Sequence, residues 1–184
     1  SEAFDGAGSK AHTVFGVILG TGVGAGIVIG KKIHTGKNKI AGEWGHNPLP
    51  WAHEGELPGK KCYCGRSGCL ETFISGPAIE REFKNLHGRN LNMKNIVKES
   101  GAGNLKAEQV IRNLEDRLAR ALAHVINILD PDSIVLGGGL SNIDRLYSNV
   151  PKIWAEYIFS DDVSTVLSKA RFGDSSGVRG AAWL

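Results

Sequence analysis

Three cysteines lie within a span of eight residues, at Cys62, Cys64 and Cys69. An odd number of thiols so close together makes a poor disulfide framework, whereas three thiolates on one short loop are typical zinc ligands. Structural zinc takes four nitrogen or sulfur ligands in tetrahedral geometry, so a fourth must come from another segment. His46 and His53 are the nearby candidates, and spacing alone does not choose between them. The alternative is three reduced cysteines that pack as small apolar residues.

Two glycine-rich segments are the next candidates for binding. Residues 20–26 have the sequence Gly-Thr-Gly-Val-Gly-Ala-Gly, and residues 137–139 are three glycines after an apolar run. The first segment partly fits a dinucleotide fingerprint, but that motif requires a helix next, and the strand-like residues 27–29 follow instead. A Walker loop is excluded because Lys32 stands where Ser or Thr is required. A hairpin turn that presents backbone N–H groups to phosphate fits better, with a plain glycine-rich hairpin as the alternative.

Apolar periodicity predicts the elements that must position these residues. Strands are predicted at residues 13–19, 27–29, 33–35, 134–136 and 163–167. Helices are predicted at residues 77–87, 92–99, 106–129, 142–158 and 176–184, with Asn142 as a cap and Asp130-Pro131 ending the longest helix. Residues 36–70 lack periodicity, and a loop of that length implies a function or an internal cross-link such as a metal. The alternation of strands and helices indicates an α/β fold.

Composition excludes several classes of protein. The 184 residues suffice for one domain with a buried core, and 41% hydrophobic with 22% charged residues is typical of a globular chain. No run reaches the roughly eighteen apolar residues of a membrane span. The N-terminal residues lack the basic and apolar regions of a signal peptide, so the expected compartment is the cytoplasm. The net charge is +3 and the basic residues are scattered, which argues against a nucleic-acid-binding face.

In sequence order, the motifs resemble those of the ROK family of sugar kinases and repressors. The matching segments are Gly20–Gly26, Gly-Glu-Trp-Gly-His (42–46), Cys-Tyr-Cys-Gly-Arg-Ser-Gly-Cys-Leu-Glu (62–71), Asp130-Pro131, Gly137–Gly139 and residues 173–182. The resemblance covers essentially the whole chain. Residues 42–51 and 71–76 are most similar to bacterial fructokinases of the mannofructokinase type, and N-acetylglucosamine kinases are close neighbours.

The resemblance implies an actin-like, ribonuclease H-like ATPase lobe with a zinc-bearing loop at residues 42–71 and a C-terminal α/β part at 105–184. The implied sugar contacts are Glu43, His46 and Glu71. The implied contacts with MgATP are Gly20, Thr21, Gly22, Val23, Gly24, Ala25, Gly26 and Ile27 for the phosphates, and Gly137, Gly138 and Gly139 for the adenosine. The implied ligands of a structural Zn²⁺ are His46, Cys62, Cys64 and Cys69. For Glu71, the alternative is a solvated acid at a helix start, which the helix dipole favours.

The resemblance also shows a departure. Family kinases begin with a lobe that carries a first phosphate loop and an Asn-Asp pair whose aspartate is the catalytic base, and neither is present here. Residues 1–6 resemble the stretch after that pair, so we expect a C-terminal lobe without the N-terminal lobe and with no catalytic residue of its own. Family members commonly form homodimers through this lobe, and neither nucleic acid nor membrane is an expected partner.

The expected function of the complete protein is ATP-dependent phosphorylation of a hexose. Fructose is the first expectation, followed by mannose, glucose and N-acetylglucosamine. A sugar-responsive ROK repressor with an upstream helix-turn-helix is the alternative from another functional class, and a zinc-stabilised interaction domain is a third. The glycine segment and the Glu-Trp-Gly-His-Asn sequence at residues 43–47 favour the kinase.

Overall fold

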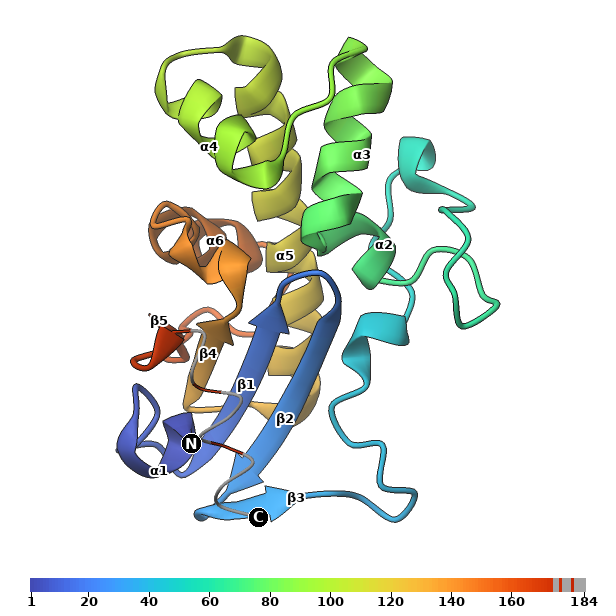
Figure 1. The fold of residues 1–184 in the computed structure, drawn as a ribbon. Helices are drawn as coiled ribbons and strands as arrows, with labels where there is room; N and C mark the ends of the chain where they lie inside the picture. Colours follow the sequence, from blue (N-terminus) through green and yellow to red (C-terminus); the bar gives the residue numbers. More distant parts are fainter. Residues whose placement is uncertain (174–175, 177–179, 181–184) are drawn as a thin grey trace.

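A computed structural model describes residues 1–173, 176 and 180 of the chain. Within this part, five strands form one mixed sheet in the order β3-β2-β1-β4-β5 (Figure 1). The strands are β1 (Thr13–Leu19), β2 (Val23–Ile29), β3 (Lys32–His34), β4 (Ser133–Gly137) and β5 (Val166–Lys169). Since β1 pairs antiparallel with β2 but parallel with β4, segments far apart in sequence lie side by side at the centre of the sheet.

The helices gather mainly on one face of the sheet and beyond its upper end in Figure 1. They are α1 (Glu2–Asp5), α2 (Glu71–Ile74), α3 (Gly76–His87), α4 (Met93–Gly101), α5 (Leu105–Leu129) and α6 (Leu146–Trp154), with short 3-10 turns η1 (Trp44–His46), η2 (Glu54–Glu56) and η3 (Gly139–Asn142). The four-residue helices α1 and α2 were not predicted, because one turn is too short to show a periodic pattern. No helix among the described residues is long and apolar enough to cross a membrane.

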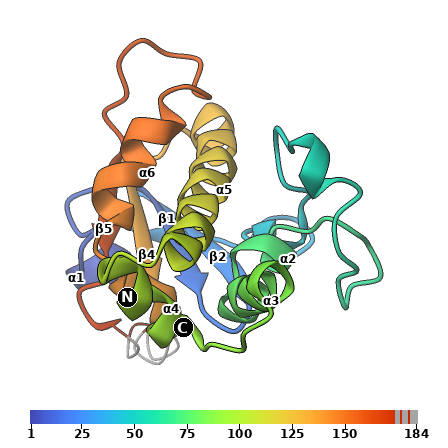
Figure 2. The same ribbon diagram turned by 90° about the horizontal axis from the view of Figure 1, so that it is seen from above.

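The core lies between the sheet and α5. Alternate residues of β1, such as Val17 and Leu19, are buried in one cluster with Leu118 and Leu122 of α5. Figure 2 shows α5 and α6 together on this side of the sheet. Among the described residues, the opposite face carries a small buried cluster beside α1, and Ile18 there is 47% exposed. The predicted α/β fold and the long helix are confirmed.

More of the glycine segment belongs to a strand than predicted. The second strand begins at Val23 rather than at residue 27, so the turn shortens to Gly20–Gly22. Gly24 and Gly26 pair in register with β1. This pairing keeps the segment in a strand conformation despite the low strand propensity of glycine.

Three predictions near the C-terminus need correction. The predicted helix at 142–158 is replaced by η3 and the shorter α6, because Ile143 is extended and buried between them. Asn142 therefore ends η3 and does not cap α6. The last strand covers Val166–Lys169 rather than 163–167. The helix predicted at 176–184 falls almost entirely outside the described residues.

Residues 36–70, called the arm below, extend to one side of the sheet in Figures 1 and 2. The arm contains the turns η1 and η2 and two isolated β-bridges, and no longer element. It leaves β3 at one end of the sheet and returns to α2 near the other end. The predicted absence of periodic structure here is confirmed.

Candidate functional site

Four potential metal ligands converge on the arm: His46, Cys62, Cys64 and Cys69. One ligand atom from each lies within 4.8 Å of the other three. The sulfur of Cys62 is 3.5 Å from Nδ1 of His46, and the sulfurs of Cys64 and Cys69 are 3.6 Å apart. Two sulfurs bound to zinc at about 2.3 Å in tetrahedral geometry are separated by roughly 3.8 Å, so these residues fit such an ion.

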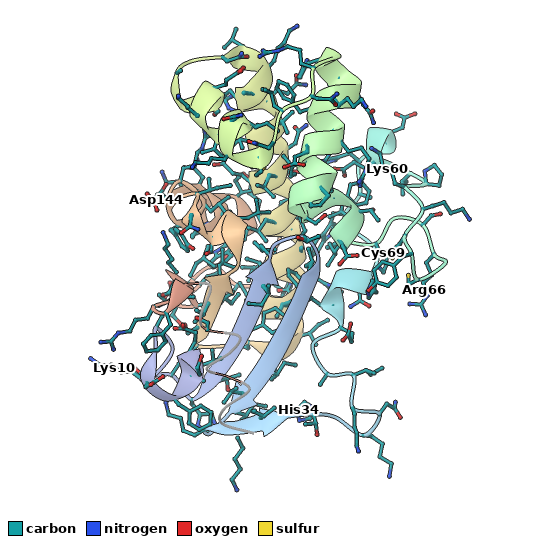
Figure 3. All side chains as sticks on the ribbon, in the orientation of Figure 1. Lys10, His34, Lys60, Arg66, Cys69 and Asp144 are labelled. Carbon is teal, nitrogen blue, oxygen red and sulfur yellow. The ribbon has the colours of Figure 1, made fainter. Side chains whose placement is uncertain are left out.

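The cysteine loop is closed by its own backbone. The N–H of Cys62 donates to the carbonyl of Arg66 at 2.8 Å, and the N–H of Gly65 donates to the carbonyl of Cys62 at 3.0 Å. Gly65 and Gly68 have φ values of 89° and 76°, a left-handed conformation that glycine adopts without a steric penalty. These two turns direct the thiols inward, and Figure 3 shows Cys69 where the arm returns to α2.

The histidine ligand is delivered by η1, which packs closely on β2. A Cβ atom at Gly45 would lie 2.1 Å from the carbonyl oxygen of Val23, and one at Gly42 would lie 2.1 Å from that of Ala25. Only glycine therefore allows the arm to approach the strand at these two positions. The spacing of the two glycines explains how the sequence places His46 opposite the cysteine loop.

The two candidate histidines differ in their surroundings. The Nε2 atom of His46 lies 2.9 Å from the hydroxyl of Tyr63, and the two rings pack edge to face at 5.0 Å. His53 lies outside the cluster, with a side chain that is 62% exposed and 3.7 Å from Asp116. Sequence reasoning did not select Tyr63, although its position between two cysteines could have drawn attention to it.

The thiols of the cluster differ in acidity. A hydrogen bond from the backbone of Arg66 lowers the pKa of Cys64 to about 7. Burial raises the pKa of Cys69 to about 12. Without a cation, Cys64 therefore loses its proton at a lower pH than Cys69 does, and the thiolate is the form that binds metals.

Of the two predicted sugar-contact acids, Glu71 lies at the end of the sheet where β1 turns into β2. Glu71 begins α2, and its Oε2 accepts a hydrogen bond from the N–H of Val23 at 2.9 Å. A Cβ atom at Gly22 would be 2.8 Å from the same oxygen, so the acid is in contact with the glycine turn rather than only with solvent. Desolvation, followed by the charges of Glu71, Cys62 and Glu43, raises the pKa of Tyr63. Glu43 directly precedes η1, the turn that carries His46.

A pocket of about 720 Å³ opens beside the same turn. Its lining includes Gly20 and Thr21 of the turn, Gly139 of η3, and Gly76 with Pro77 at the start of α3. The N–H of Gly76 donates to the carbonyl of Gly20 at 2.8 Å. The two predicted glycine segments thus meet at one pocket, at the end of the sheet where β1 and β4 both finish.

The rest of the two glycine segments lies elsewhere. Residues 24–27 belong to β2 and line, together with Gly137, a separate hollow of about 570 Å³ over the open face of the sheet. Gly138 has φ 79°, and a Cβ atom there would lie 2.5 Å from the carbonyl oxygen of Leu19. This residue allows the backbones of β1 and the β4–η3 connection to touch.

A buried arginine ties the arm to α5. The side chain of Arg120 is fully buried and donates to the carbonyls of Pro50 and Trp51 at 3.1 and 2.9 Å. The same guanidinium donates to the carboxylates of Glu56 and Asp116 at 2.9 and 2.7 Å. The arm is thus held both near its middle, by α5, and near its end, by the metal-ligand cluster.

Comparison with known structures shows that the chain has the fold of one lobe of an actin-like sugar kinase. The chain matches a ROK hexokinase from Thermus thermophilus with a TM-score of 0.86 and 29% identity, covering 98% of this chain and 59% of that one. It matches a ROK family glucokinase from Streptomyces griseus, crystallised with glucose and AMPPNP, with a TM-score of 0.85 and 28% identity, covering 98% and 62%. A ROK family transcriptional regulator, a homologue of the E. coli MLC protein, has a TM-score of 0.83 at 27% identity, covering 98% and 47%.

The chain belongs to the ROK family, whose sequence profile matches residues 1–184. Among its curated relatives, the N-acetyl-D-glucosamine kinases of Vibrio vulnificus strain YJ016 and Vibrio cholerae are 38% and 39% identical over 188 residues. The alignment covers 100% of this chain and 62% of each relative, so the chain spans less than two thirds of their length. The expected family is confirmed, whereas the expected preference for fructokinases is not supported by these relatives.

Proposed function

We propose that this chain is the C-terminal lobe of a sugar kinase that transfers the γ-phosphoryl group of MgATP to a hexose hydroxyl. The observation that carries the proposal is the convergence at the β1–β2 turn. On one side of this turn, two glycine segments line a pocket, and on the other Glu71 reaches the turn from the start of α2, directly after the arm. Phosphate oxygens suit the backbone N–H groups of such a turn, and sugar hydroxyls suit the carboxylates.

The proposed substrate is N-acetylglucosamine, with glucose, mannose and fructose as competitors. Support comes from the names of the curated relatives at 38% and 39% identity. Glu43, His46 and Glu71 are the proposed sugar-contact residues in this chain. No residue here is proposed as the catalytic base, and we expect negligible turnover from the 184 residues alone.

For the metal cluster we propose a structural zinc ion held by His46, Cys62, Cys64 and Cys69. Three sulfurs and one nitrogen form a closed ligand set that zinc prefers. When bound, zinc would supply a cross-link without taking part in the chemistry. The ligands would hold η1 against the cysteine loop and so fix the ring of His46 beside Glu43 and Glu71.

We also propose that the protein forms a homodimer through an apolar surface beside the C-terminal half of α5. Trp51, Ile128 and Phe159 are 47%, 74% and 100% exposed, which is unusual for side chains of this size. Two hydrogen bonds between Asn127 of α5 and the backbone of residues 157 and 159 hold the segment after α6, which carries Phe159, beside α5. Sedimentation analysis of the protein and of Phe159→Ser tests this proposal, which a monomeric native protein would contradict.

The kinase proposal is tested by ATP-dependent ADP release from the protein with its preceding lobe, across the four sugars. We expect turnover to be highest with N-acetylglucosamine. Glu71→Gln keeps an oxygen for the N–H of Val23 but removes the charge, so we expect kcat/KM to fall roughly 10- to 100-fold. Glu54→Gln, an exposed acid in the arm, is the matched control and should leave kcat/KM unchanged.

Other outcomes have distinct meanings. Turnover with fructose alone would contradict the proposed N-acetylglucosamine specificity and support the fructokinase expected from the sequence. Silence with all four sugars, by a protein with zinc bound and its fold intact, would favour a sugar-responsive regulator, whose fold the chain equally resembles.

A further inference from the structure

One wall of the pocket beside the β1–β2 turn runs along α3 from the glycine turn to α4. The first turn of α3 touches the glycine turn, where Gly76 bonds to Gly20. Glu80 lies four residues further along α3, on the same side of the helix one turn away, and lines the same pocket. The Oε1 atom of Glu80 accepts a hydrogen bond from the N–H of Met93 at 2.7 Å, at the start of α4. Glu80 therefore stands between the glycine turn and α4.

Apolar side chains from two elements also line the pocket, together with Lys94 and Asn142. Met93 and Val97 are one helical turn apart on α4, and Leu140 and Ile143 of the η3 segment line the same pocket. The pocket thus offers the glycine turn, where the described residues give the N–H of Thr21 no hydrogen-bond partner, then the carboxylate of Glu80, and then apolar side chains beside it. A nucleoside triphosphate has the same sequence of groups, namely phosphates, a ribose diol and a planar base.

The carboxylate of Glu80 has capacity left for a ligand. Oε1 is occupied by the N–H of Met93, and the described residues give Oε2 no hydrogen bond and the carboxylate no ion pair. A carboxylate can accept hydrogen bonds from two adjacent hydroxyls but would repel a phosphate. The bond to Met93 also holds Glu80 in place before any ligand arrives.

We propose that Glu80 selects a ribonucleotide by accepting hydrogen bonds from the ribose hydroxyls, while the base lies against Met93 and Val97. The inference rests on the proposed nucleotide-binding function of the pocket and adds a specificity-determining residue to it. Nucleotides that lack the 2′-hydroxyl lose a charge-assisted hydrogen bond, and those with a 2′-phosphate place a negative charge against Glu80. Both should be disfavoured.

The test compares ATP with 2′-deoxy-ATP, using the protein with its preceding lobe. Binding is measured by calorimetry and KM by ADP release. We expect the native protein to bind ATP roughly tenfold more tightly than 2′-deoxy-ATP. Glu80→Gln retains an oxygen for the N–H of Met93, and we expect it to reduce that ratio to about twofold or less, mainly by weakening ATP. Lys84→Gln, an exposed residue one turn further along the same helix that does not line the pocket, is the matched control and should keep the native ratio.

Each outcome bears on the proposal. An equal loss of affinity for both nucleotides in Glu80→Gln and Glu80→Ala would mean that Glu80 only supports the start of α4, and would overturn the inference. An unchanged ratio in both variants would overturn it as well, while leaving the nucleotide site intact. If the native protein binds neither nucleotide, then the inference and the proposed function fail together.

Discussion

The arm and the α5-sheet core are stabilised in different ways. In the core, apolar side chains from β1, β4 and α5 are almost completely buried in one cluster. In the arm, the buried apolar side chains are Trp44, Leu49 and Leu70, besides two of the cysteines. So few contacts do not offset the entropy of ordering a segment of this length. We therefore expect the arm to depend on the proposed zinc site and on its ion pairs with α5.

The comparison teaches where function and stability are coupled. The sugar-contact candidates Glu43 and His46 lie on the arm, and Glu71 directly follows it. The glycine turn and the pocket lie on the core. Loosening the arm should therefore impair sugar recognition first, whereas loosening the core should impair the whole fold.

Removal of the metal should produce the largest difference in stability between the arm and the core. We expect one zinc ion per chain, and Cys69→Ser or a chelator should abolish its binding. Trypsin should then cut the arm at Lys60, Lys61 and Arg66, while the helical circular dichroism of the core persists. Metal analysis and mass spectrometry of limited digests provide the measurement. His53→Ala, on the same arm but outside the cluster, should keep its zinc. An intact arm in the zinc-free protein would contradict the comparison.

The next largest effect should come from Arg120→Met. The substitution leaves Asp116 and the carbonyls of Pro50 and Trp51 without this donor, and leaves Glu56 with Arg117 as its only arginine partner among the described residues. Removal of one partner from a buried ion pair costs about 3–5 kcal/mol in the free energy of unfolding. Urea denaturation followed by circular dichroism measures it. A change below about 1 kcal/mol would show that the arm does not need this anchor.

These differences explain how much of the fold could be predicted. The strand at 13–19 stood out as a β-branched apolar run of strand length, and the long helix stood out because its apolar residues recur every three or four positions. The start of β2 was missed because pairing with β1, and not residue type, extends it through Gly24 and Gly26. The break between η3 and α6 was missed because a local pattern does not reveal that Ile143 is extended and buried.

The site was predictable where ligands are close in sequence. The cysteine spacing predicted the loop, and the family resemblance chose His46, which the structure brings to the thiols. Spacing alone could not make this choice, because the approach of η1 to β2 is a tertiary contact. Glu80 carried no motif at all. Its place in the pocket depends on a hydrogen bond to Met93 across the α3–α4 connection.

Lowering the pH should cause a smaller loss of stability, to which the arm and α5 both contribute. Burial would raise the pKa of Glu56 on the arm, but hydrogen bonds from Arg120 and Arg117 outweigh it and lower the pKa to about 2. Hydrogen bonds from Arg145 lower the pKa of Glu108 in the core to about 2 as well. The ordinary value is 4.5, so the folded state binds these protons more weakly than the unfolded state. The stabilisation is full above pH 4.5 and falls as the pH drops from 4.5 towards 2.

Urea denaturation at pH 7 and at lower pH values measures this dependence, and we expect the free energy of unfolding to fall as the pH drops below 4.5. Glu56→Gln should remove the contribution of the arm and make the pH dependence shallower. Glu54→Gln, the exposed neighbour in the same turn, should leave the slope unchanged. Equal slopes in native protein and Glu56→Gln would place the acid sensitivity in the core alone.

The smallest effect should come from Arg112→Gln, which tests whether ion pairing by itself matters. Arg112 pairs with Glu108 at 2.7 Å from one turn away on α5, but its side chain is 73% exposed. Water and salt screen such a pair, so we expect the free energy of unfolding to change by at most about 0.5 kcal/mol. The guanidinium of Arg145 binds the same carboxylate and also that of Glu115, which is 3% exposed, so Arg145→Gln should cost several times more. Equal losses would mean that burial of the charges does not decide their contribution, and the anchor assigned to the arm would lose its physical basis.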